Sequence, residues 1–259
     1  MTCIAIDWSG AKKPAGKLWI AEATEGSLRR LQPLDSRDHV LRELLQYLRA
    51  DEHTIVGLDF AFSFPCWFCR EHSVSSAAQM WQVVDEEGER WLRECSWPFW
   101  GRPGKQKPAL DAHFRRTEEH IGAANSIKPK STFQIGGAGA VGTGTIRGMP
   151  FLPRLREEGF AVWPFDDPRQ QMVVEIYPRS LTGSVVKSSE AARAKYLMDH
   201  RWRLPEGFAS KAIGSEDAFD AAVSALVMDT HCEQFPSLLS GDVLSRIEGE
   251  IWAPCRQAT

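Results

Sequence analysis

The sequence predicts a single α/β domain in which a mixed sheet is flanked by helices and interrupted by a large insertion. Two short apolar strands, each ending on an aspartate, are separated by an amphipathic helix. A crossover helix between two such strands normally makes them parallel. After a long segment of different composition, another apolar strand and an alanine-rich helix resume the same pattern, which indicates one α/β domain.

The first half of the predicted sheet lies within the first sixty residues. Apolar runs bounded by turn residues predict strands over 3–6, 18–23, 28–34 and 54–59. A stripe of apolar residues predicts a helix over 36–50, with Asp35 or Ser36 as its N-cap. We therefore expect the first and fourth strands to be parallel and to deliver Asp7 and Asp59 to the same edge.

Residues 62–170 differ from the segments on either side, being rich in Trp, Pro, Gly and charge. We expect helices near 74–95 and 109–124 and a glycine-dense stretch over 136–148. The strand pattern then resumes at 172–176, and a final helix is expected over 216–229. Because strands bracket this segment, we interpret it as an insertion that packs around the sheet edge and is not a separate domain.

Composition limits the classes of protein to consider. Of the 259 residues, 43% are hydrophobic and 25% charged, which is enough apolar material for a core and excludes a disordered chain. The net charge of −3 gives no support to a dedicated, tight nucleic-acid binder. Six scattered cysteines do not form a disulfide pattern. The initial apolar stretch stops at Asp7, which is not typical of a signal peptide or a transmembrane span. We expect a cytoplasmic protein with reduced thiols and no membrane partner.

Carboxylates recur where ligand sites of open α/β sheets lie. Asp7 and Asp59 end strands, Glu175 lies on the later strand, and Asp217 and Asp220 are spaced i, i+3 on the last helix. Hard cations such as Mg²⁺ or Mn²⁺ prefer such oxygen ligands, and two metals can assist phosphoryl transfer. The alternative is that Asp217 caps the helix and Asp220 is exposed. For the acids taken together, a metal site is the favoured interpretation.

Several segments also resemble the conserved blocks of a protein family. These are IAIDWSG (4–10), VGLDFAFSFP (56–65), FQIGGAGAVG (133–142), VWPFD (162–166), VEIYP (174–178) and DAFDAA (217–222). They resemble the uncharacterised "domain of unknown function 429" family, whose members are described as predicted nucleases of ribonuclease H-like fold. The resemblance spans nearly the whole chain and implies that fold for it.

The resemblance also implies roles for the acids. Asp7 would be the acid of the first strand, Asp59 that of the neighbouring strand, and Asp220, with Asp217 near it, that of the last helix. The expected function is hydrolysis of nucleic acid phosphodiesters with Mg²⁺ or Mn²⁺ held by Asp7, Asp59 and Asp220. Asp217 and Glu175 would support them, although many members of the fold carry no catalytic acid on the strand of Glu175.

Other motifs are weaker. Gly137 to Gly142 match G-x-G-x-x-G, but Gly144, Gly148 and Pro150 lead us to expect no helix after them, as a dinucleotide site requires. The glycines could form an anion-binding loop or a mobile surface loop. Cys66 and Cys69 have C-x-x-C spacing without a second pair, so partly buried thiols are favoured over zinc or redox chemistry.

A basic, aromatic-rich part of the insertion could bind single-stranded nucleic acid or could be a solvated loop over a Trp-rich core. Its members are Trp81, Trp91, Trp97, Trp100, Arg102, Lys105, Lys107, Arg115, Arg116, Lys128 and Lys130. Two alternatives to a nuclease stay open. One is a nucleotide-binding phosphotransferase or ATPase of the related sugar kinase-like fold, and the other is a non-catalytic nucleic-acid binder.

Overall fold

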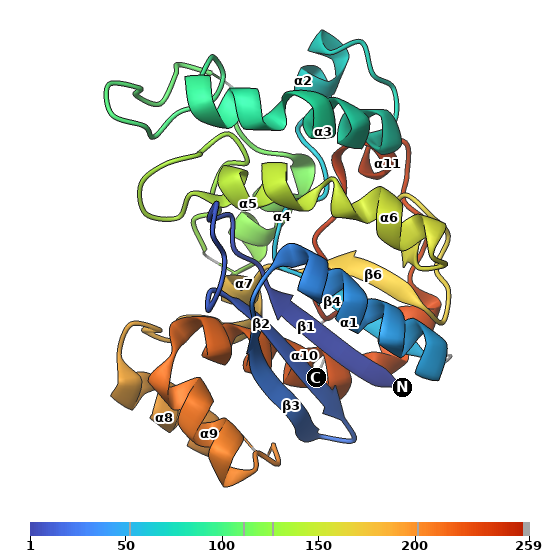
Figure 1. Ribbon diagram of the computed structural model, residues 1–259, viewed down its shortest axis with the longest axis vertical. Helices are drawn as coiled ribbons and strands as arrows, with labels where there is room; N and C mark the ends of the chain where they lie inside the picture. The colour runs from blue at the N-terminus through green and yellow to red at the C-terminus, as the bar shows by residue number, and fades with distance from the viewer. Residues whose placement is uncertain (52, 111, 126, 201, 256–259) are drawn as a thin grey trace.

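The computed structural model describes residues 1–51, 53–110, 112–125, 127–200 and 202–255 (Figure 1). These residues form a six-stranded sheet with strand order β3-β2-β1-β4-β6-β5. The strands are β1 (Thr2–Asp7), β2 (Leu18–Thr24), β3 (Ser27–Leu34), β4 (Thr54–Leu58), β5 (Ala161–Val162) and β6 (Met172–Glu175).

Helices cover both faces of this sheet. They are α1 (Arg37–Ala50), α2 (Cys66–Glu71), α3 (Ala77–Glu94), α4 (Arg116–Asn125), α5 (Val141–Gly148), α6 (Phe151–Glu157), α7 (Pro178–Thr182), α8 (Glu190–Asp199), α9 (Glu206–Gly214), α10 (Glu216–Thr230), the 3-10 helix η1 (Cys232–Ser237) and α11 (Ser245–Glu248). The predicted α/β class, with a mixed sheet flanked by helices, is confirmed.

The sheet is mixed, and its antiparallel and parallel parts meet at β1. Strand β1 pairs antiparallel with β2 and parallel with β4, as the crossover through α1 predicts. Helix α1 begins after Ser36, whose hydroxyl accepts a hydrogen bond from the backbone N–H of His39. Strand β6 then pairs parallel with β4, so three neighbouring strands end at one edge.

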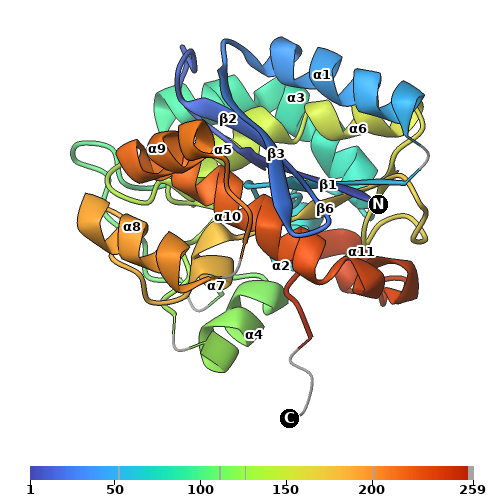
Figure 2. The same cartoon turned by 90° about the horizontal axis from the view of Figure 1, so that it is seen from below.

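Alternate side chains of β1 enter two different cores. Ile4 and Ile6 pack with α1 and the insertion, whereas Cys3 and Ala5 pack with α10. Figure 2 shows the same division, with α1 on one side of the sheet and α10 on the other. Because both faces are covered, β4 is buried along its whole length and β1 is buried at all but its two end residues, as is typical of parallel strands.

The insertion shares the core on the α1 side. Phe64, Trp81 and Phe133 belong to the same buried cluster as Ile4 and Val56 of the sheet. In the views of Figures 1 and 2, helices α3, α5 and α6 lie on the side of the sheet that α1 covers. Among the described residues, no helix is both long enough and apolar enough to cross a membrane.

The prediction that no helix follows the glycine motif is wrong, because α5 starts at Val141. Its glycines are needed for close packing. A Cβ on Gly142 would lie 2.2 Å from the carbonyl oxygen of Thr132, and one on Gly148 would lie 2.5 Å from the ring of Phe60. Tertiary contact thus outweighs the low helix propensity of glycine. The predicted start of the preceding helix at 109 is also wrong, since α4 begins at Arg116.

Replacing Gly148 by Ala should destabilise the protein by about 1–3 kcal/mol, because the added methyl group overlaps the buried Phe60 ring. Chemical denaturation measures this change. Gly207→Ala in α9 is the control, since open space surrounds that position, and it should leave stability unchanged or raise it by up to about 1 kcal/mol. Equal unfolding free energies for the two variants would contradict this explanation of the glycine-rich helix.

Candidate functional site

Two of the predicted acids lie at the ends of adjacent parallel strands. Asp7 is the last residue of β1, and Asp59 directly follows β4. The backbone N–H of Asp59 donates to the carbonyl of Ile6 over 3.1 Å, which ties the two strand ends together. The following residues, Trp8 and Phe60, pack with ring centres 4.7 Å apart. Both carboxylates are therefore held on short, packed segments of chain.

The third acid comes from α10, which crosses the opposite face of β1 and β2. Ser215 is its N-cap, with a hydroxyl that accepts from the N–H of Ala218, so Asp217 is not the cap. Asp220 lies one turn into the helix with its side chain 13% exposed, and it forms an ion pair with Lys187. Its second oxygen, Oδ1, is buried without a hydrogen-bond partner among the described residues.

Electrostatics show that these carboxylates share one environment. Burial, and then the negative charge of Asp220, raise the pKa of Asp59 to about 8. Burial, followed by the charges of Asp59, Asp220 and Asp217, raises the pKa of Asp7 well above its usual range, while Lys187 opposes this shift. Burial also raises the pKa of Asp220 against the effect of Lys187. Like charges near one another oppose ionisation, so a cation is the natural partner of this cluster.

A cavity of about 780 Å³ opens over Asp59 and Asp220. Its wall carries four cations, which are Lys128, Lys130, Arg179 and Lys187. Within the part of the chain that the structure describes, neither Lys128 nor Lys130 forms an ion pair. The lining of the cavity therefore combines acids with positively charged side chains, a pattern that suits an anionic ligand bound beside a metal.

The donor chemistry fits a hard divalent cation, because Asp7, Asp59 and Asp220 offer only oxygen atoms. Among the described residues, however, no three Asp, Glu, His or Cys side chains are gathered closely enough to hold a metal ion. The ammonium group of Lys187 instead supplies the positive charge at Asp220. Lys187 could not be predicted as a site residue, because it lies in a Ser-rich loop without a motif.

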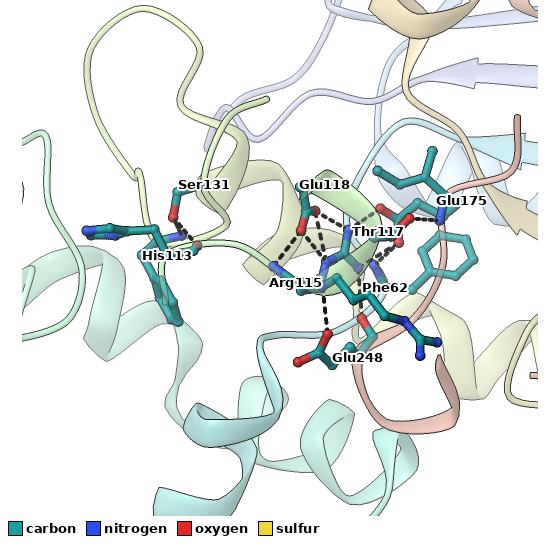
Figure 3. A network of polar contacts seen from close by, with 11 residues as sticks. Phe62, His113, Arg115, Thr117, Glu118, Ser131, Glu175 and Glu248 are labelled. Atoms are coloured by element: carbon teal, nitrogen blue, oxygen red, sulfur yellow. Dashed lines mark hydrogen bonds and ion pairs between the residues drawn. The ribbon is translucent and has the colours of Figure 1, made fainter. Parts of the chain in front are cut away.

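Glu175, which we expected to support this cluster directly, has a different set of partners (Figure 3). Its oxygens accept from the two terminal nitrogens of Arg115, over 2.9 and 2.5 Å. One of them also accepts from the backbone N–H of Phe62 over 2.9 Å. Both carboxylate oxygens are thus occupied, and Glu175 acts on the site through its charge, which contributes to the raised pKa of Asp59.

Arg115 is the centre of this network. It is fully buried, and its guanidinium also binds Glu118 in α4 and the main-chain carbonyl of Glu248. The Glu248 carboxylate in turn accepts from the backbone N–H groups of Cys66 and Arg116. The expectation that Arg115 belongs to a basic surface is therefore wrong. A loop arginine gives no signal in the sequence that it is buried with two carboxylates.

The remaining features of the insertion divide between core and surface. Cys66 and Cys69 are buried, and burial raises the pKa of the Cys69 thiol to about 11. Trp81 and Trp91 are core residues, whereas Trp97 is 57% exposed and Trp100 lines a cavity. Aromatic residues of this segment thus serve mainly the core, with Trp100 available to a ligand.

Comparisons with models of protein families, with curated proteins and with solved structures each find no match.

Replacing Arg115 by Met should destabilise the protein by about 3–5 kcal/mol, because Glu118 and Glu175 would stay buried without their cation. The neighbouring Arg116 is the matched control. It pairs with the exposed Asp242, so Arg116→Met should cost about 1 kcal/mol or less. Urea unfolding of both variants tests this difference, and similar losses would contradict the structural role of Arg115.

The metal-free protein should lose stability as the pH rises from about 4 to about 8. The folded pKa of Asp59 is about 8, against an ordinary value of 3.8, so the folded state holds a proton that the unfolded chain has released. Stability from such a group is present at low pH and is lost as the pH rises through this window. Thermal unfolding of wild type and Asp59→Asn measures it, and the variant should show a flatter pH profile. Identical profiles would contradict the raised pKa.

Proposed function

We propose that this protein is a divalent-metal-dependent hydrolase of nucleic acid phosphodiesters. The observation that carries the proposal is the joint placement of Asp7, Asp59 and Asp220 around one acidic cluster beside a cavity with a cationic wall. The mixed six-stranded sheet is compatible with the ribonuclease H-like fold that the resemblance implies. Mg²⁺ or Mn²⁺ bound there supplies Lewis acidity and lowers the pKa of water.

The protein's own residues have distinct roles in this proposal. Asp7, Asp59 and Asp220 would hold the cation after drawing closer together around it, and they must lose their protons to do so. Lys187 has to leave Asp220 and can then contact a phosphate oxygen, since it lines the same cavity. Lys128 and Lys130 hold the phosphate backbone, which is the usual use of lysine beside nucleic acid.

The structure also gives an observation in favour of the phosphotransferase alternative. Gly139 and Val141, at the start of α5, line the cavity, so a glycine-rich turn leads into a helix N-terminus beside the acids. Such a terminus favours nucleotide phosphates. Protection by ATP and Mg²⁺ without cleavage of any nucleic acid would support this second function. Nucleic-acid binding without turnover would support a non-catalytic binder.

Replacing Asp7 by Asn should abolish metal-dependent cleavage and leave the fold intact. The amide is nearly isosteric, but it lacks the charge that holds a hard cation. Because one repulsive carboxylate is removed, the melting temperature of the metal-free variant should stay level or rise. Cleavage of single-stranded DNA, branched DNA and RNA is measured with Mg²⁺ and with Mn²⁺.

The control for this experiment is Asp199→Asn, an acid 56% exposed on α8 and paired with Lys195. It should keep wild-type activity. An Asp7→Asn variant that cleaves as well as wild type would remove Asp7 from the mechanism. If the wild-type protein cleaves none of the substrates, the phosphotransferase alternative is favoured over the nuclease.

A further inference from the structure

A second cavity, of about 650 Å³, adjoins the acid-lined one. The two cavities share three wall residues, Ile127, Lys128 and Lys130. A ligand with an anionic group beside Asp59 and Asp220 therefore lies next to the second cavity. Trp100, Lys107 and these two lysines belong to the basic and aromatic set of the insertion, and the structure gathers the four residues around this cavity.

The second cavity differs in chemistry from the first. Trp100 and Phe114, both half-buried, give it an aromatic lining, and Gly122 and Pro129 add apolar surface. Among the described residues that line it, the acidic side chains are Glu118 and Glu119, and Glu118 is already bound to Arg115. This lining suits a flat, largely apolar group better than a second phosphate.

The Trp100 side of the cavity is held by backbone pairing. The N–H of Trp100 donates to the carbonyl of Phe133 over 3.1 Å, and the N–H of Ile135 donates to the carbonyl of Trp100 over 2.9 Å. Gln134, between these partners, donates from its side-chain nitrogen to the carbonyls of Gly136 and Ala138. The wall is preorganised, which lowers the entropic cost of binding.

Positive charge surrounds this aromatic wall. The Lys107 ammonium lies 5.9 Å from the centre of the Trp100 ring, and Lys128 and Lys130 form the border with the acid-lined cavity. Aromatic faces interleaved with lysines are the arrangement by which proteins hold single-stranded nucleic acid, through base stacking and phosphate contacts. Lys128 and Lys130 thus lie between the aromatic cavity and the acids. A nucleotide whose base occupies the aromatic cavity would place its phosphate near these two lysines.

We propose that the cavity lined by Trp100 and Phe114 binds the nucleobase of the nucleotide whose phosphate lies beside Asp59 and Asp220. This inference rests on the proposed function, and it assigns single-stranded nucleic acid as the substrate class. A base within a duplex is stacked and paired, so it cannot enter a side cavity without leaving its stack.

The test is isothermal titration calorimetry of the full chain with Mg²⁺, using adenosine 5′-monophosphate, uridine 5′-monophosphate and ribose 5-phosphate. Both nucleotides should bind about tenfold or more tightly than the base-free sugar phosphate, the order expected of one base–aromatic stack. Trp100→Leu should abolish this preference, and Trp97→Leu, which removes an exposed tryptophan outside the cavity, should retain it.

Lys107→Ala is a second variant that does not disturb the core, because Lys107 is exposed. It should weaken binding of both nucleotides severalfold with no change in melting temperature. Equal affinities of wild type for nucleotides and ribose 5-phosphate would overturn the proposal, as would a Trp100→Leu protein that stays folded and keeps the preference.

Failure of the nuclease proposal gives a different result. If wild type cleaves no nucleic acid but prefers nucleotides in a Trp100-dependent manner, the base cavity stands and the hydrolytic function fails. If it cleaves single-stranded nucleic acid and Trp100→Leu leaves the KM unchanged, the hydrolytic function stands and the base cavity fails.

Discussion

The buried charge of Arg115 is the constraint on which the geometry of the sheet edge depends. Its guanidinium joins Glu175 at the end of β6, Glu118 in α4 and the main chain at Glu248, segments that are far apart in the sequence. Separating either carboxylate from Arg115 would leave a buried charge without its partner, at a cost of several kcal/mol. Because Glu175 also binds the N–H of Phe62, the same network fixes the chain just after Asp59. The acid cluster is thus positioned by a neighbouring ion-pair network that is not itself the site.

Burial has different consequences for the acids around Arg115 and for the acids around Asp7. Around Arg115 each carboxylate has a cation or backbone donors, so burial makes the contacts strong. Around Asp7 burial and the charges of neighbouring acids raise the pKa values of the carboxylates, and Lys187 opposes these shifts. The first arrangement serves the stability of the fold. The second is unfavourable unless a further cation binds, which is the relation expected between the proposed site and the fold that holds it.

Much of the sheet could be predicted, because apolar runs that end on Asp7 and Asp59 reflect a simple local rule. The parallel pairing of β1 and β4 followed from the intervening helix. Two kinds of feature could not be predicted. Helix α5 forms despite its glycines because Phe60 and Thr132 approach it closely, a contact that only the fold creates. The pairings of Arg115 with Glu175 and of Lys187 with Asp220 span 60 and 33 positions, and nothing local distinguishes these two cations from surface ones.

The net charge of the chain says little about the surface around the acids, because charge is distributed unevenly. Glycine makes part of that distribution possible. The side chain of Lys130 runs over Gly139, where a Cβ would lie 2.8 Å from its Cε atom, so the lysine loop and the glycine turn before α5 pack as one wall. Lys130 can lie on that wall between the acid-lined cavity and the aromatic one because Gly139 has no side chain. The G-x-G-x-x-G stretch therefore acts here through the space it leaves for a cation, in addition to any contact of its N–H groups with a phosphate.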